Sequence, residues 1–185
     1  MADIFLVGSI FVNKILDTGK DGHVRVDKDD LRSYLSEIIR SFIYTVNWEF
    51  RGNQSPFTNV SVFDKYFLES LCPDYSLNGY AAKPELVRLL QDIYIEAMND
   101  ELERTILTFP VTTACFSIVT EEDQKTSEFK DYQLNEIKDK DFVKYISEKN
   151  IKFGFMNIFC GKSSTLSSCK CNSSLNINYN LFNKF

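Results

Sequence analysis

The stretch that decides the fold is residues 105–119, which read TILTFPVTTACFSIV. β-branched and aromatic residues dominate it, and these residue types favour extended backbone. Pro110 lies inside the stretch and cannot donate a hydrogen bond to a neighbouring strand. We therefore expect either two short strands or one strand that begins after the proline, with a buried strand around residues 111–119.

The segments upstream of this strand alternate between helical and extended patterns. A helix is predicted over residues 27–48, because Asp27 can cap it and Asp29 and Asp30 suit the positive end of its dipole. Its apolar residues recur at helical spacing: Leu31, Leu35, Ile38, Ile39, Phe42 and Ile43. After a polar loop, residues 60–63 alternate as a short strand does. Pro84 then begins a second helix at a favourable first position.

Downstream, a polar helix is predicted over residues 127–149, and a further strand within IKFGFMNIFC, residues 151–160. The elements therefore follow the order helix, strand, helix, strand, helix, strand. This order favours an α/β fold in which helices pack on a short mixed sheet.

The amino-acid composition and net charge limit the classes of partner that this chain can bind. The chain has 185 residues, of which 44% are hydrophobic and 25% charged, as expected for one foldable domain. Its formal net charge of -5 argues against DNA or RNA as a partner, because proteins that bind the phosphate backbone concentrate positive charge. No stretch approaches the 18 or so apolar residues that a membrane span needs. The five cysteines are scattered, so we expect free thiols in a cytoplasmic protein.

Familiar catalytic and metal motifs are missing from the sequence. His23 is the only histidine, which excludes sites that need two imidazoles. The GKSS stretch at 161–164 lacks the upstream glycine of a phosphate-binding loop. Cys160, Cys169 and Cys171 lack the paired CxxC spacing of zinc sites, so no metal site is predicted.

Three ordered blocks resemble one enzyme family. They are FIYTVNWEFRGNQSPFTNVSVFDKYFLESLCPDY (42–75), RTILTFPVTTACFSI (104–118) and FGFMNIFCGKSSTLSSC (153–169). They resemble, in the same order, parts of the catalytic domain of anaerobic (class III, glycyl-radical) ribonucleoside-triphosphate reductases. The resemblance runs from about residue 7 to residue 169 and implies part of that family's α/β barrel, so we assign residues 1–169 to a partial reductase domain.

The resemblance also implies site residues. Cys169 matches the first of the family's two adjacent cysteines and is the candidate for the thiyl radical that abstracts a ribose hydrogen. In the alternative alignment the radical position is the second cysteine, which is Lys170 here, and lysine cannot form a thiyl radical. The polar loop before the first strand supplies candidate substrate-binding residues: Asn53, Gln54, Ser55, Thr58 and Asn59. Their amides and hydroxyls suit phosphate or ribose oxygens. The alternative is that they only satisfy the turn that leads into the strand.

The family implies ribonucleoside triphosphates and effector nucleotides as ligands, and a homodimer or the remainder of the reductase as a protein partner. Its glycyl radical is generated by an iron-sulfur, S-adenosylmethionine-dependent activase, and we expect these 185 residues to bind no cofactor themselves.

The resemblance ends at residues 170–185, an asparagine-rich tail, and no RVxGY-like glycyl-radical stretch occurs in the 185 residues. We therefore expect a truncated reductase that is inactive alone. The alternative is a non-catalytic nucleotide-binding or subunit-interaction module built on the same scaffold.

Overall fold

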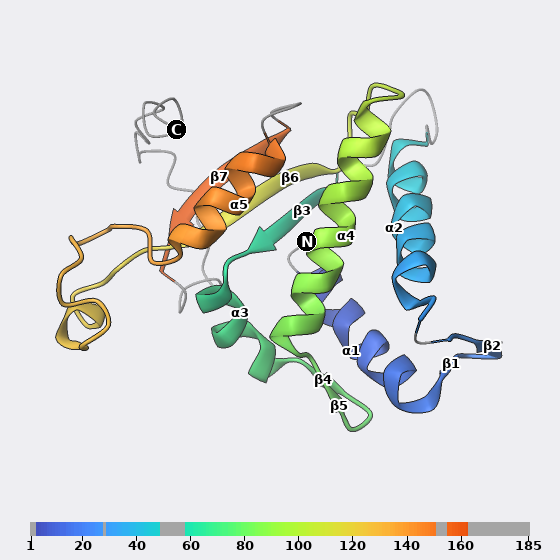
Figure 1. Ribbon diagram of the computed structural model, residues 1–185, viewed down its shortest axis with the longest axis horizontal. Helices are drawn as coiled ribbons and strands as arrows, with labels where there is room; N and C mark the ends of the chain where they lie inside the picture. Colours follow the sequence, from blue (N-terminus) through green and yellow to red (C-terminus); the bar gives the residue numbers. More distant parts are fainter. Residues whose placement is uncertain (1–2, 28, 49–57, 151–154, 163–185) are drawn as a thin grey trace.

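Three parallel strands and four long helices make up most of the molecule. The computed structural model describes residues 3–27, 29–48, 58–150 and 155–162 (Figure 1). The helices are α1 (Asp3–Thr18), α2 (Leu31–Asn47), α3 (Lys65–Leu71), α4 (Pro84–Leu102) and α5 (Lys140–Asn150), with short 3-10 turns at Cys72–Asp74 and Asp123–Lys125. The strands are β1 (Lys20–Asp21), β2 (Val24–Arg25), β3 (Asn59–Phe63), β4 (Ser76–Leu77), β5 (Tyr80–Ala81), β6 (Val111–Ser117) and β7 (Met156–Gly161). The predicted α/β class is confirmed.

The main sheet has the order β3-β6-β7, and both pairs are parallel. Helix α4 connects β3 to β6, and α5 connects β6 to β7, as parallel neighbours require. The antiparallel pairs β1-β2 and β4-β5 form separate two-stranded ribbons. Within the described ranges the sheet does not close into a barrel, and β3 and β7 are its two edge strands.

One face of the sheet is packed against α4 and α5. Tyr94 of α4 hydrogen-bonds Thr112 of β6 at 2.6 Å, and the ring of Phe142 in α5 lies 5.2 Å from that of Phe116. Because side chains alternate along a strand, the residues that share this face follow from the register. They are Val60, Val62, Thr112, Ala114, Phe116 and Met156, which are buried, and Ile158 and Cys160, which are half-buried.

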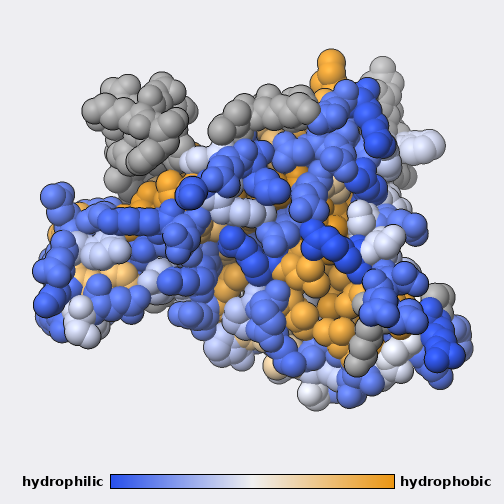
Figure 2. Space-filling view, viewed as in Figure 1, coloured by the Kyte–Doolittle hydropathy of each residue, from blue (hydrophilic) through white to orange (hydrophobic). Residues whose placement is uncertain are grey.

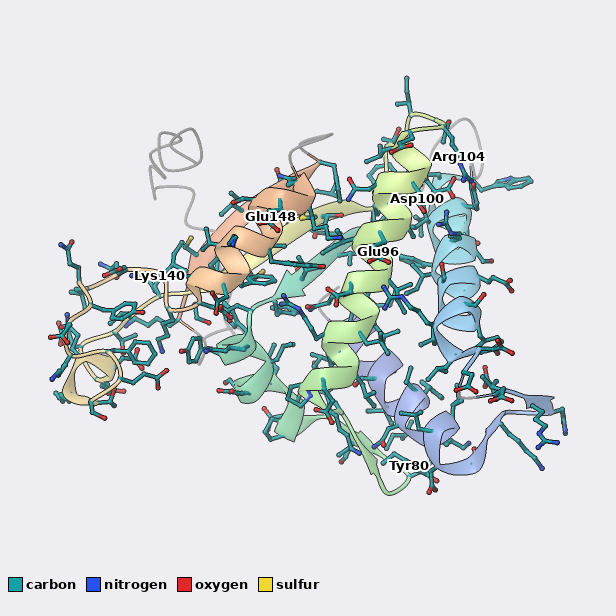
Figure 3. All side chains as sticks on the ribbon, in the orientation of Figure 1. Tyr80, Glu96, Asp100, Arg104, Lys140 and Glu148 are labelled. Atoms are coloured by element: carbon teal, nitrogen blue, oxygen red, sulfur yellow. The ribbon has the colours of Figure 1, made fainter. Side chains whose placement is uncertain are left out.

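Helices α1 and α2 pack on α4 rather than on the sheet. Gly8 lets α1 approach closely, since a Cβ added there would lie 3.1 Å from Leu90. Arg32 of α2 pairs with Glu96 at 2.7 Å and Arg40 with Asp100 at 2.5 Å, so α2 runs parallel to α4 (Figure 3). Apolar residues gather on the surface over α1 and the first half of α4 (Figure 2).

Three predicted boundaries or elements are wrong. Helix α2 begins at Leu31, after Asp30, and Asp27 instead accepts a hydrogen bond from the Asp29 N–H at 3.2 Å. The polar helix predicted over 127–149 is shorter, because α5 begins only at Lys140. The segment before it folds as turns around buried Phe129. Helix α1 was not predicted, because apolar residues such as Val7 and Phe11 lie on its exposed face and obscure the periodic pattern of its buried residues.

At the free edge of β3, a side chain of α4 hydrogen-bonds the strand backbone. In the amide orientation that satisfies both of its polar atoms, Gln91 donates to the Phe63 carbonyl at 3.2 Å and accepts from the Phe63 N–H at 2.9 Å. Gln91 is only 1% exposed, so its amide replaces a neighbouring strand at this position.

Replacing Gln91 with leucine is expected to lower the thermal midpoint by about 6 °C, because two buried backbone groups lose their partners at a cost of about 2 kcal/mol. Thermal unfolding followed by circular dichroism measures this effect. The control is Gln133→Leu at an exposed position, which is expected to change the midpoint little. Equal midpoints for the two variants would contradict the assigned role of Gln91.

Candidate functional site

The candidate site lies on the face of the sheet opposite α4 and α5. Register places Ser61, Thr113 and Asn157 side by side across β3, β6 and β7. Asn59 lies two residues before Ser61 on the same face and accepts a hydrogen bond from the Thr113 hydroxyl at 3.4 Å. We call Asn59, Ser61, Thr113 and Asn157 the polar patch.

The polar patch is open, in contrast to the covered face. Asn157 is exposed, and the other three residues are half-buried. Neighbouring strands are about 4.8 Å apart, so the row of three side chains extends about 10 Å across the sheet. A small ligand can therefore contact residues from all three strands at once.

The chemistry of the polar patch is neutral. Its hydroxyls and amides donate and accept hydrogen bonds but carry no charge at any ordinary pH. No residue that the register of β3, β6 and β7 places on this face is charged. Such a surface suits hydroxyl, carbonyl and amide groups of a ligand, whereas the strongest phosphate contacts come from charged donors or helix termini.

Next to the polar patch the same face becomes apolar and closed. Phe63 and Cys115 are cross-strand neighbours in the following row, and both are buried. The Cys115 thiol lies 3.9 Å from the Thr113 carbonyl oxygen. The patch is therefore bounded toward the carboxyl ends of the strands by an apolar row, which is buried at Phe63 and Cys115 and half-buried at Phe159 of β7.

The predicted site residues fall into two groups. Asn59 belongs to the polar patch, and Thr58 is buried just before it, where its carbonyl accepts from the Val111 N–H at 2.8 Å. Asn53, Gln54, Ser55 and Cys169 lie outside the described residues. Their roles therefore stay predictions.

Sequence reasoning missed Ser61, Thr113 and Asn157. The alternation of residues 60–63 assigns Ser61 to the polar side of a strand, and this was the available signal. However, only the register shows that the three polar residues from separate strands form one row.

A buried carboxylate ties the carboxyl ends of β3 and β6 together. Asp64 is fully buried and accepts from the Ser117 N–H at 2.5 Å and the Ser117 hydroxyl at 2.8 Å. It also caps α3 by accepting from the Phe67 N–H at 2.9 Å. Burial raises the pKa of the Asp64 carboxyl above its ordinary value, although these hydrogen bonds oppose the rise.

Cys72 and Cys160 are poor nucleophiles, because the pKa of each thiol is raised. Burial and the nearby Asp64 carboxylate raise the pKa of Cys160 to about 11. Burial and Glu85 raise the pKa of Cys72 to about 11. Both therefore remain protonated thiols at neutral pH, and the thiolate is the reactive form in polar chemistry.

Metal and membrane features are not found in the described part of the chain. No group of three or more His, Cys, Asp or Glu side chains there is arranged to hold a metal ion. No described helix is both long and apolar enough to cross a membrane.

Comparison with solved structures identifies the class of fold. Neither protein-family profiles nor curated proteins match this sequence. Solved structures do match, and they are anaerobic ribonucleotide reductases. The Thermotoga maritima enzyme with citrate in the active site has a TM-score of 0.68 and 23% identity, covering 87% of this chain and 26% of the reductase.

Two further structures of the Thermotoga maritima enzyme agree. The complex with dATP and CTP gives a TM-score of 0.69 at 24% identity, covering 88% of this chain and 24% of that one. The form with glycerol in the active site gives a TM-score of 0.70 at 24% identity, covering 87% of this chain and 24% of the reductase. The chain therefore has the fold of one part of an anaerobic ribonucleotide reductase and spans about a quarter of its length.

Proposed function

We propose that this chain contributes strands of the catalytic α/β barrel of an anaerobic ribonucleoside-triphosphate reductase, and that its polar patch contacts the uncharged part of a ribonucleotide. The observation that supports this proposal is the row of neutral polar side chains on the open face of the sheet. The chain shares its fold with these reductases over 86–88% of its length. In a barrel with its helices outside, the face away from the helices lines the interior, where a barrel that is wide enough can hold a ligand.

The neutral chemistry of the polar patch selects the part of the nucleotide it contacts. Ribose hydroxyls and base amides exchange hydrogen bonds with Thr, Ser and Asn side chains without a charge on either partner. The triphosphate needs donors from elsewhere, and Asn53, Gln54 and Ser55 of the preceding loop are our candidates.

The reaction that we propose for the complete reductase is replacement of the ribose 2′-hydroxyl by hydrogen, begun by a thiyl radical, with the hydroxyl leaving as water and two electrons supplied by formate or a thiol reductant. Cys169 is the candidate residue, and the glycyl radical that oxidises it would be generated by the family's activase. The 185 residues by themselves are expected to bind nucleotide without reducing it, because they span only about a quarter of the reductases they resemble. A second copy or the remaining reductase segments are the proposed protein partners.

Binding of CTP to the 185-residue chain tests the contact. Replacing Thr113 with valine keeps its shape and removes one neutral hydrogen bond, so we expect the Kd, measured by calorimetry, to rise about 2- to 10-fold. The matched control is Thr105→Val at an exposed position beyond α4. The proposal fails if the wild-type chain does not bind CTP at millimolar concentration, or if both variants bind equally well.

A further inference from the structure

Asn47, the last residue of α2, ties this helix to the segment that leads into β6. Its side-chain Oδ1 accepts hydrogen bonds from the Thr108 N–H and the Phe109 N–H, each at 3.1 Å. Its Nδ2 group donates to the Phe109 carbonyl and, at 2.8 Å, to the Ile43 carbonyl in α2. The amide therefore uses both of its donors and both of its acceptor positions, which is its full capacity.

The segment that receives these bonds has no regular structure of its own. Residues 106–110 belong to neither a helix nor a strand, and β6 begins directly after them at Val111. Backbone groups outside helices and sheets need other partners, and Asn47 supplies them for Thr108 and Phe109. Asn47 therefore fixes the chain immediately before it enters β6.

The start of β6 is also where this strand meets the polar patch. The Val111 N–H donates to the Thr58 carbonyl at 2.8 Å, and Val111 is the register partner of Asn59. Two residues further along β6, the Thr113 hydroxyl donates to Asn59 Oδ1 at 3.4 Å. The chain thus leaves α2 at Asn47 and enters β3 at Asn59, and both points are tied to the start of β6.

Docking of α2 on α4 depends on other residues. Arg32 and Arg40 of α2 pair with Glu96 and Asp100 of α4, and the carboxyl ends of these two parallel helices lie at the same end of the molecule (Figure 1). The hydrogen bonds that the Asn47 side chain makes outside α2 go to the segment before β6 and not to α4. The geometry of Asn47 is therefore directed at the strand and not at the helix pair.

We infer that Asn47 is a positioning residue for the polar patch: through residues 108–111 it sets where β6 begins, and thereby holds Thr113 beside Asn59. This inference rests on the proposed function, because it concerns nucleotide binding at the same patch. Asn47 itself lies outside the patch and acts only through the strand. Without its side chain the start of β6 shifts against β3, and the Thr113 hydroxyl is no longer held for the ligand.

Binding of CTP to the 185-residue chain, measured by calorimetry, tests the inference. Asn47→Ala is expected to raise the Kd about 3- to 10-fold, because a displaced Thr113 loses its hydrogen bond to the ligand. The matched control is Asn13→Ala. Asn13 is a half-buried residue of α1 that donates to the Ala81 carbonyl at 3.1 Å, in a ribbon separate from the main sheet. Its replacement is expected to change the Kd less than about 2-fold.

A double variant separates positioning from a general loss of stability. If Asn47 acts by placing Thr113, then Asn47→Ala combined with Thr113→Val raises the Kd by about the larger of the two single effects and not by their product. Circular dichroism shows whether each variant is folded. If Asn47→Ala does not fold, Asn47→Asp takes its place in the cycle, because its side chain still accepts from Thr108 and Phe109 but cannot donate to the Phe109 carbonyl.

Two results would overturn the inference and leave the proposed function standing. In the first, the Asn47 variant binds CTP as tightly as the wild type, although Thr113→Val weakens binding. In the second, the two single effects multiply in the double variant, which would mean that Asn47 supports the fold without placing Thr113. A wild-type chain that does not bind CTP would overturn both the inference and the proposed function.

Discussion

Replacing Asp64 with alanine is expected to lower the free energy of unfolding by about 3 kcal/mol, because three donors lose their acceptor. The Ser117 N–H and hydroxyl are buried with Asp64, and the Phe67 N–H loses its helix cap. Urea unfolding followed by circular dichroism measures the change. Asp131→Ala at an exposed position is the control and is expected to change stability by less than about 0.5 kcal/mol.

The Asp64→Asn variant keeps the shape of the side chain but removes one of its two acceptor oxygens. It keeps one oxygen, but its NH2 group faces a donor, so we expect a smaller loss than in the alanine variant. An Asp64→Ala protein as stable as the wild type would show that Asp64 does not hold the two strands together.

The contribution of Asp64 to the free energy of unfolding is expected to depend on pH. Because burial raises the pKa of Asp64, the folded state binds this proton more tightly than the unfolded state. The contribution to stability is therefore complete below the ordinary carboxyl pKa of about 3.9 and is lost as pH rises through the raised pKa. Asp64→Asn removes this dependence, which urea unfolding of both proteins across the acidic range detects.

Truncating Phe116 to alanine is expected to cost about 4 kcal/mol, since this ring is fully buried between the sheet and α5. Chemical unfolding again measures the change. Phe11→Ala is the matched control, because Phe11 on α1 is 49% exposed and its truncation is expected to cost less than about 1 kcal/mol.

Some alanine variants of buried rings do not fold at all. If Phe116→Ala gives no cooperative transition, Phe116→Leu, expected to cost about 1 kcal/mol, provides the measurable comparison. Equal costs for the Phe116 and Phe11 alanine variants would contradict the assignment of Phe116 to the core beneath α5.

The sequence was a good guide where one physical signal was strong. Pro84 and the apolar spacing that follows it predicted α4, and the β-branched run after Pro110 predicted β6. It was a poor guide to α1, because apolar residues on the exposed face of this helix, such as Val7 and Phe11, obscure the pattern made by its buried residues. It also overextended α5, because polar residues at 127–139 fit a helix and a series of turns equally well.

The sequence by itself determined the α/β class, the strands β3, β6 and β7 and the likeness to anaerobic ribonucleotide reductases, because local propensity and periodicity depend on neighbouring residues. Only the tertiary structure decided that Ser61, Thr113 and Asn157 form one row and that Asp64 joins two strands. These groupings depend on strand order and register. Contacts between residues more than 40 positions apart set both, and no local pattern encodes them.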